Sequence, residues 1–307
     1  MLHSQRSARD KRVELRRLLS GATAAQFPGA FNALSARLIE QHGFPGVYIS
    51  GAVLSANQGL PDIGLTTSTE VAHESQQISR MIDLPTIVDA DTGFGEPLNV
   101  ARTVQILEDA GVSALHIEDQ VNPKRCGHLD GKSVVSEEFA TQRIRAAVGA
   151  RRDDQLVVIA RTDIRAVNGF PAAVERARAL VDAGADVIFP EALISLEEFE
   201  LMAQSVGVPI LANMTEFGKS ELFSHQELSD AGVKLIIYPV SLLRLAMGAA
   251  ERGLHTLATE GSLNSVVPSM HTRSNLYELI DYSAYTDFDS RVYTGHPPTE
   301  EQKGSDK

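Results

Sequence analysis

Short apolar runs recur along the chain and alternate with stretches in which apolar residues repeat every three to four positions. Eight runs predict strands: Ala25–Phe31, Gly46–Ser50, Thr86–Asp91, Ala114–Asp119, Leu156–Thr162, Asp186–Glu191, Pro209–Met214 and Lys234–Pro239. Most are nearly continuous, which is typical of strands buried on both faces. Helical periodicity is found between them, for example in Leu98–Asp109, Glu137–Val148, Ala172–Asp182 and Leu196–Ser205. The alternation predicts parallel βαβ units.

The number of these units favours a (β/α)₈ barrel of the TIM type over an open, doubly wound sheet. An open sheet would show a glycine-rich phosphate loop after its first strand, and residues 52–64 contain none. The tripeptide Asp-Ala-Gly closes three of the predicted helices, at Gly111, Gly184 and Gly232. Glycine suits the left-handed position just past a helix end.

We expect one barrel domain over residues 1–290. Residues 5–19 predict a helix ahead of the barrel. Residues 241–285 predict extra C-terminal helices, split near Gly261. This stretch is longer than one barrel helix needs, so we expect part of it to pack against another subunit. The polar residues 291–307 predict a disordered tail.

Composition limits the classes of binding partner and the cellular compartment that we expect. The net charge is −12, and no Lys/Arg-rich block follows the first helix, which argues against nucleic acid. Any site for anions must therefore be a local pocket. The one cysteine suits a reducing compartment. Residues 1–20 lack an apolar signal segment, and no run of about 18 apolar residues exists. We expect a cytoplasmic protein that does not enter a membrane.

Polar residues gather at the carboxyl ends of the predicted strands. They are Ser50, Asp89, Asp91, Glu118, Asp119, Arg161, Asp163, Glu191, Asn213 and Thr215. Barrel enzymes build their active sites at this face. Any one of these residues could instead be a loop cap or a solvated turn residue, but so many together predict a convergent site.

Asp89 and Asp91 are candidate ligands of a divalent cation. Strand alternation would place both carboxylates on one face. Hard oxygen ligands suit Mg²⁺ or Mn²⁺, and Glu118 or Asp119 could contribute directly or through water. The alternative is a turn cap, because the turn-forming residues 92–95 follow. No His/Cys cluster has zinc spacing.

The lone cysteine lies in the polar loop Lys124-Arg125-Cys126-Gly127-His128. Cationic neighbours favour its thiolate, so Cys126 could act as a nucleophile or as a general acid. Arg161, Arg244 and Arg273 could bind carboxylates. The two arginines of the C-terminal helical region could equally be surface residues. His116, inside an apolar strand, is expected to be a hydrogen-bonded core histidine.

The cysteine loop resembles the signature of the isocitrate lyase / phosphoenolpyruvate mutase superfamily and, more closely, that of its 2-methylisocitrate lyases. Similar segments occur from about residue 20 to 285. They include Ser50-Gly51, residues 59–62, 88–95, 116–120, 160–163, 189–192 and 213–218, and Thr272-Arg273. The resemblance implies a β/α barrel, a homotetramer with helices exchanged between subunits, and Mg²⁺-dependent carbon–carbon cleavage of a tricarboxylate to pyruvate and succinate.

The resemblance also implies roles for individual residues. Asp89 and Asp91 would bind the metal, and Cys126 and Arg161 would be catalytic. Substrate contacts would come from Ser50, Gly51, Ala52, Asp62, Lys124, Gly127, His128, Arg161, Phe189, Glu191, Asn213, Thr215, Arg244 and Arg273. Phe189-Pro190 would line the pocket for a methyl group. Ala52 and residues 129–131 depart from the pattern of some methylisocitrate lyases.

A mechanism follows as a hypothesis. A base removes the C2 hydroxyl proton, the C2–C3 bond breaks, and Cys126 protonates the resulting carbanion. Tyr48 is the candidate base if nearby cations lower its pKa, and Glu118 or Glu191 could serve instead. Isocitrate lyase and a decarboxylase or hydrolase of oxaloacetate-like acids are alternative activities. A metabolite-binding protein without catalysis is a further alternative, although it would have no need of the thiol.

Overall fold

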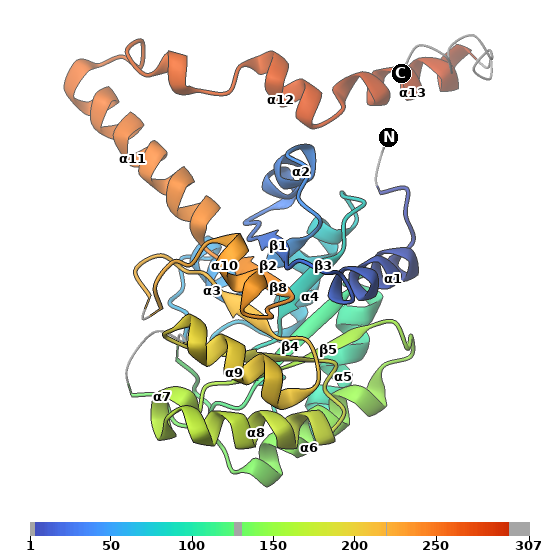
Figure 1. The fold of residues 1–307 in the computed structure, drawn as a ribbon. Helices are drawn as coiled ribbons and strands as arrows, with labels where there is room; N and C mark the ends of the chain where they lie inside the picture. The colour runs from blue at the N-terminus through green and yellow to red at the C-terminus, as the bar shows by residue number, and fades with distance from the viewer. Residues whose placement is uncertain (1–3, 126–130, 219, 295–307) are drawn as a thin grey trace.

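A closed barrel of eight parallel strands forms the centre of the molecule (Figure 1). The structure is a computed structural model that describes residues 4–125, 131–218 and 220–294. Two ladders, β2-β3-β4-β5-β6 and β1-β8-β7, are joined by bridges from Gly29 to Tyr48 and from Ile188 to Ile210. The predicted barrel is confirmed. Its strands are β1 (Ala25–Pro28), β2 (Val47–Ile49), β3 (Thr86–Asp89), β4 (Ala114–Glu118), β5 (Val157–Thr162), β6 (Val187–Pro190), β7 (Leu211–Asn213) and β8 (Leu235–Tyr238).

Alternate residues of each strand serve two apolar layers, as strand geometry requires. Phe27, Ile87 and Ile159 point into the barrel, where they belong to one buried cluster. Val88 and Val158 point outward and belong to a larger cluster beneath the helices. Both faces of the strands are therefore buried, which explains their nearly continuous apolar runs.

Helices follow the strands and cover the barrel. They are α2 (Ala33–Gln41), α3 (Gly51–Asn57), α4 (Ser68–Ser79), α5 (Pro97–Asp109), α6 (Glu137–Ala150), α7 (Arg165–Asn168), α8 (Phe170–Asp182), α9 (Leu196–Val206) and α10 (His225–Asp230). The three Asp-Ala-Gly tripeptides end α5, α8 and α10. Their glycines have φ values of +83°, +104° and +86°, the left-handed conformation that the sequence predicts.

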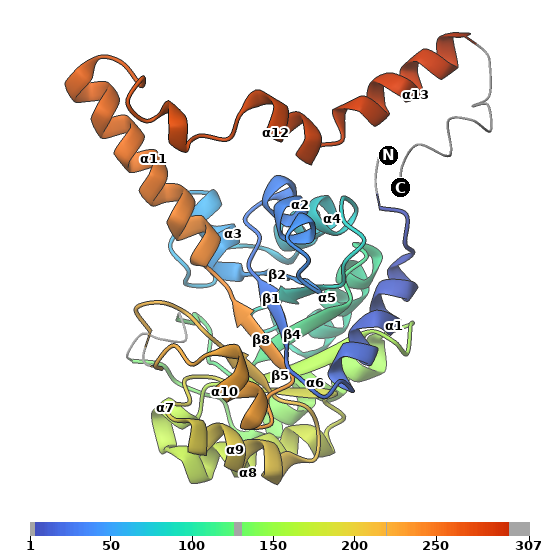
Figure 2. The ribbon, with the colours of Figure 1, turned by 45° about the horizontal axis from the view of Figure 1, so that its top comes forward.

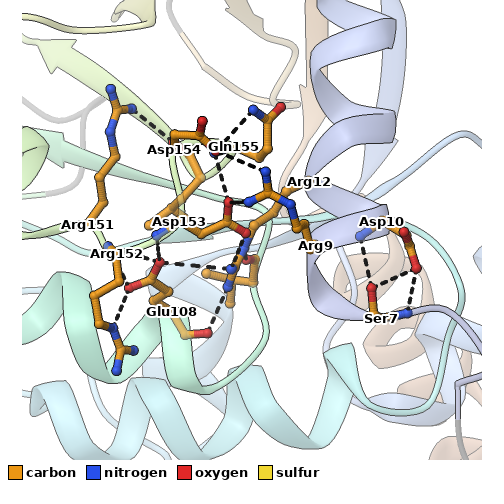
Figure 3. Close-up of polar contacts among 12 residues, drawn as sticks. Ser7, Arg9, Asp10, Arg12, Glu108, Arg151, Arg152, Asp153, Asp154 and Gln155 are labelled. Carbon is orange, nitrogen blue, oxygen red and sulfur yellow. Dashed lines mark hydrogen bonds and ion pairs between the residues drawn. The ribbon is translucent and has the colours of Figure 1, made fainter.

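The first helix, α1 (Ala8–Leu19), packs Leu15 and Leu19 against the inward-pointing strand residues, and its polar residues contact neighbouring loops (Figure 3). It begins after Ser7, three residues later than the start of the predicted range. Arg12 donates to the carbonyl of Val112, just before β4, and pairs with Asp153, before β5 (2.9 Å). Arg16 likewise pairs with Asp186, before β6 (3.2 Å). The helix is therefore fastened to loops that precede several strands, and the opposite, carboxyl-terminal face is left for a site.

The C-terminal helices leave the barrel. The long helix α11 (Ser241–Glu260) points away from it, and α12 (Arg273–Leu279) and α13 (Tyr282–Thr294) extend beyond α2 (Figure 2). Gly261, with a φ of +66°, ends α11 where the sequence predicts a break. Helix α13 continues to Thr294, so the prediction of a disordered tail from residue 291 is wrong for residues 291–294. None of the described helices is long and apolar enough to cross a membrane.

Candidate active site

A cavity of about 260 Å³ opens at the carboxyl ends of the strands. It is formed by residues in the carboxyl-terminal halves of the strands and in the segments that follow β2 to β8, together with the first turn of α11. The predicted site residues that line it are Tyr48, Ser50, Ala52, Asp62, Asp89, Lys124, Arg161, Phe189, Glu191, Asn213, Thr215 and Arg244. Residues from separate strands therefore converge at one face, as the pattern of polar strand ends predicts.

Asp89 and Asp91 form the acidic end of the site, and each is 5% exposed. Strand β3 ends at Asp89, and Asp91 lies in a turn with a φ of +46°, which aspartate tolerates better than most residues. The main-chain N–H of Asp91 donates to Oδ1 of Asp89 (3.0 Å), and that of Gly51 donates to Oδ2 (3.2 Å). A turn therefore brings the carboxylates together, and the explanation by strand alternation is wrong.

Lys124 sits against these acids. Its Nζ lies 2.7 Å from Oδ1 of Asp91 and also pairs with Asp62. Burial alone would lower the pKa of Lys124, but Asp89, Asp91 and their neighbours raise it, so the ammonium stays charged. Burial, followed by the charge of Asp89, raises the pKa of Asp91 to about 6. The two carboxylates repel each other, and a divalent cation would relieve that repulsion.

The donor set fits a hard divalent cation. Oδ1 of Asp91 is buried and, within the described part of the chain, accepts no hydrogen bond of good geometry, although it pairs with Lys124. Groups of three His, Cys, Asp or Glu side chains suited to a metal are absent from the described residues. Mg²⁺ needs no such group, because it commonly binds one or two carboxylates and keeps several waters. The pair Asp89 and Asp91 is thus suited to Mg²⁺.

Tyr48 lines the cavity, and the buried ring of His116 stacks against it. The Tyr48 hydroxyl lies 2.7 Å from Nε2 of His116, and Nδ1 of that ring is 3.7 Å from Oδ1 of Asp89. Burial lowers the pKa of His116 to about 4, so the ring is neutral at pH 7. Burial, and then the charge of Asp89, raise the pKa of Tyr48 well above 10. This is opposite to the lowering that a Tyr48 base requires.

Arg161 is a buried cation at the centre of the site. Its Nε and Nη2 donate to the two oxygens of Asp163 (3.0 and 3.3 Å), and its Nε lies 3.3 Å from Glu118. The guanidinium also stands over the ring of Phe189, 5.2 Å from its centroid. Burial would lower the pKa of Arg161, but Asp163 and Glu118 raise it. Arg161 is therefore held charged and in a fixed orientation.

Glu118, the last residue of β4, and Asp119, the residue after it, point in opposite directions, as successive residues of an extended chain do. Glu118 lies behind Arg161, and its Oε1 has no hydrogen-bond partner among the residues that the structure describes. Burial raises the pKa of Glu118 well above 4.5, against the effect of Arg161. Asp119 instead accepts from Thr162 (2.7 Å) and pairs with Arg176 of α8 (2.6 Å). These contacts occupy Asp119, so the suggestion that it contributes to a metal site is wrong.

Arg244, in the first turn of α11, lies at the mouth of the cavity. Its Nη1 donates to the carbonyl oxygen of Glu216 (2.8 Å) and to its carboxylate (2.9 Å). Its guanidinium stands over the ring of Phe217, 5.4 Å from the centroid. The sequence singled out the motif 213–218 but gave Glu216 and Phe217 no role, because the pairing with α11 depends on the fold.

Several predicted residues are not among those that line the cavity, including Asp91, which lies next to Asp89, and Glu118, which lies behind Arg161. Gly51 supports Asp89 from beside it, and a Cβ there would stand 3.0 Å from Oδ2 of that residue. Arg273 is exposed on α12 and is not among the described residues that line the cavity. The chain therefore does not bring Arg273 to its own site. Cys126, Gly127 and His128 lie outside the described residues.

Comparison with known proteins places the chain in a family. Residues 15–258 match the family described as Phosphoenolpyruvate phosphomutase. The chain belongs to this family. Within it, the chain is 56% identical to a probable 2-methylisocitrate lyase 2 of Corynebacterium glutamicum, over 93% of each chain.

Solved structures agree. The crystal structure of 2,3-dimethylmalate lyase, described as a PEP mutase/isocitrate lyase superfamily member, superposes with a TM-score of 0.86 at 35% identity. The match covers 94% of this chain and 96% of the other. A phosphonopyruvate hydrolase in complex with oxalate and Mg²⁺ superposes with a TM-score of 0.83 at 29% identity, covering 92% and 98%. The fold is therefore that of the superfamily.

Proposed function

We propose that this protein is a Mg²⁺-dependent carbon–carbon lyase that cleaves 2-methylisocitrate to pyruvate and succinate. The observation that carries the proposal is a cavity with two arginines, Arg161 and Arg244, on its wall and with Asp89 at its acidic end, where Asp91 lies next to Asp89. This arrangement suits an anionic substrate that needs both a metal and several cationic contacts. The high identity to a probable 2-methylisocitrate lyase supports the choice of substrate.

Asp89 and Asp91 would hold the metal, with Mn²⁺ able to replace Mg²⁺. When bound, the ion would act as a Lewis acid toward the oxygens of the 2-hydroxy acid. Lys124 would contribute a second positive charge beside it. Burial would raise the pKa of Asp89, but the protonated form of His116, followed by Lys124 and Arg161, lowers it below its usual value. Asp89 is thus ready to bind a cation at neutral pH.

The rest of the cavity would bind the three carboxylates. Arg161 and Arg244 supply guanidinium groups, and Ser50, Asn213 and Thr215 supply neutral donors. Asn213 lies 3.4 Å from the carboxylate of Glu191, which lines the same wall. Preorganised donors of this kind stabilise charge that develops during bond cleavage, because they need not reorganise at the moment of reaction.

Cleavage requires a base and an acid. The base takes the C2 hydroxyl proton, the electrons of the C2–C3 bond move onto C3, and C2 becomes the carbonyl carbon of pyruvate. Cys126 then gives its thiol proton to C3 and completes succinate. We favour Glu191 as the base over Tyr48, because Glu191 is a carboxylate that lines the cavity, whereas burial raises the pKa of Tyr48.

Steady-state rates with 2-methylisocitrate, isocitrate and oxaloacetate test the substrate. Phe189 is fully buried beneath the pocket, so it offers an apolar surface to the extra methyl group. One methyl group is worth about 10- to 200-fold in kcat/KM. We expect 2-methylisocitrate to be preferred by a factor in this range. A higher kcat/KM for isocitrate or oxaloacetate would assign the site to one of the alternative activities.

We also propose that the protein acts as a helix-swapped homotetramer in the reducing cytoplasm. Helix α11 points away from its own barrel and has no buried residue, while Leu245, Met247 and Leu254 are each at least 60% exposed. A second copy of the chain would cover this apolar surface. The same exchange would allow Arg273 to reach the site of a neighbouring subunit.

A further inference from the structure

The two arginines of the cavity use different parts of their guanidinium groups. Arg161 turns its Nε–Nη2 edge to Asp163, which occupies both of those donors. Arg244 makes all its polar contacts through Nη1, to Thr215 (3.4 Å) and Glu216. Among the described residues, Nε and Nη2 of Arg244 have no polar partner. This edge is the one that binds a carboxylate with two parallel hydrogen bonds.

Glu216 is placed to set that orientation. Its Oε2 and its carbonyl oxygen both accept from Nη1 of Arg244, at 2.9 and 2.8 Å. Its other carboxylate oxygen accepts from the hydroxyl of Ser241, so Glu216 is itself fixed to the start of α11. Burial would raise the pKa of Glu216, but the hydrogen bonds from Ser241 and Arg244 keep it below 4.5. The acceptor is therefore ionised at neutral pH.

Without this acceptor, Arg244 would be loosely held. Its side chain is 40% exposed, and its remaining contacts would be the Glu216 carbonyl, the Thr215 hydroxyl and the ring of Phe217. A long side chain with many rotamers loses conformational entropy when a ligand fixes it. An acid that fixes the guanidinium beforehand removes part of that cost from the binding step.

We propose that Glu216 is a positioning residue that holds Arg244 so that its Nε–Nη2 edge receives the substrate carboxylate farthest from the metal. The inference rests on the proposed function, because it takes the substrate to be a tricarboxylate anchored at Asp89 and Asp91. Glu216 would then increase the affinity for the distal carboxylate and would not affect the rate of the cleavage step.

A competing effect makes the proposal testable. Glu216 is an anion near an anionic substrate, so its removal would tighten binding if simple repulsion dominated. The variants Glu216→Gln and Glu216→Ala remove the same charge, but only glutamine keeps an oxygen that accepts from Arg244, and its amide can donate to Ser241. A difference between the two variants therefore reports positioning alone.

The experiment measures KM and kcat for 2-methylisocitrate with saturating Mg²⁺, and inhibition by oxalate, a fragment that would occupy only the metal end. We expect Glu216→Ala to raise KM about tenfold, the effect of losing one charge-assisted hydrogen bond. We expect kcat and the oxalate inhibition constant to change less than about threefold. Glu216→Gln should keep KM within about threefold of the original protein.

Three results would overturn the proposal. They are equal KM values for the two variants, a lower KM in both variants, or an oxalate inhibition constant that rises in Glu216→Ala by the same factor as KM. Glu198→Ala, which breaks an ion pair with Arg165 (2.7 Å) on the outer helices, is the matched control and should change nothing. Calorimetric binding of 2-methylisocitrate to Cys126→Ser, with and without Glu216→Ala, needs no turnover. If Cys126→Ser shows the binding difference but the original protein releases no pyruvate, the proposed function is contradicted and the positioning role stands.

Discussion

The Nζ atom of Lys124 lies 2.7 Å from Oδ1 of Asp91. The ammonium group of Lys124 therefore pairs with a carboxylate that is also a candidate metal ligand. Asp89 lies beside that ligand, and the charge of Lys124 stays close to any ion that these two acids bind. Lys124 is thus a cation next to the proposed metal site, and it would attract the anionic substrate while repelling the ion.

Removal of that cation should separate metal affinity from substrate affinity. We expect Lys124→Met to bind Mg²⁺ about tenfold more tightly, because one nearby positive charge no longer competes for Asp91. We expect kcat/KM to fall at least about tenfold, since the substrate loses a cationic contact. Calorimetry with Mg²⁺ and steady-state kinetics measure the two effects. Lys234→Met, at the start of β8, is the control, and weaker Mg²⁺ binding by Lys124→Met would contradict the argument.

The buried pair Lys132–Asp163 supports Arg161 from behind. The Nζ of Lys132 lies 2.8 Å from Oδ1 of Asp163, and both side chains are at most 2% exposed. Asp163→Asn should lower the free energy of unfolding by about 3–5 kcal/mol, because it leaves buried cations without their anion. It should also lower kcat/KM as Arg161 loses its fixed orientation. Thermal or urea unfolding measures the first effect.

A second substitution separates the two consequences. In Lys132→Met/Asp163→Asn, one of the stranded charges is gone, so part of the lost stability should return. Activity should stay low because Arg161 still lacks Asp163. Full recovery of kcat/KM in the double variant would show that Asp163 acts only on stability.

The apolar runs located all eight strands, because a strand covered on both faces needs apolar residues at nearly every position. Polar residues at the ends of those runs then marked the site. The turn that positions Asp91 was not predictable from alternation, because the strand ends two residues earlier. The direction of Asp119 was also missed, since a shift of one residue along a strand reverses the face on which a side chain lies.

Contacts between residues far apart in the sequence explain the other features that the sequence could not predict. Glu216 pairs with Arg244, 28 residues further along the chain, and no local pattern indicates that pair. Arg273 was expected at the site, but its place depends on α11, which leaves the barrel. A sequence shows that α11 is amphipathic but not which barrel it covers. The helix exchange therefore stays a prediction.

Lys11 should make stability depend on pH. Its ammonium is buried and donates to the carbonyls of Ser79 and Ile82 (both 2.7 Å), and burial lowers its pKa to about 8. Between pH 8 and 10.5 the unfolded chain keeps this proton and the folded protein does not. Folding is therefore favoured as pH rises through that window, by up to about 1.4 kcal/mol per pH unit.

The test compares urea unfolding of the original protein and Lys11→Met at pH 7, 8, 9 and 10. We expect the difference in unfolding free energy, original minus variant, to be constant below pH 8 and to increase above it. A difference that stays flat, or that decreases with pH, would show that the folded protein does not disfavour the charged form of Lys11.

The exposed surface of α11 predicts a change in assembly. Leu254 is 68% exposed on this helix, and a glutamate there would place a charge in the proposed subunit contact. We expect Leu254→Glu to reduce the assembly to smaller species in analytical ultracentrifugation. Leu98→Glu is the matched control, because Leu98 is 86% exposed on α5 of the barrel itself. A tetramer that persists in Leu254→Glu would argue against exchange of this helix.

The most direct test of the account is product release from 2-methylisocitrate, followed by nuclear magnetic resonance with and without Mg²⁺. The account predicts pyruvate and succinate in equal amounts, no release after chelation with EDTA, and recovery when Mg²⁺ is returned. Release should also fall by at least about 100-fold in Cys126→Ser, the scale of a lost general acid. If the protein binds 2-methylisocitrate in the presence of Mg²⁺ but forms no pyruvate, the proposed cleavage at this site is wrong.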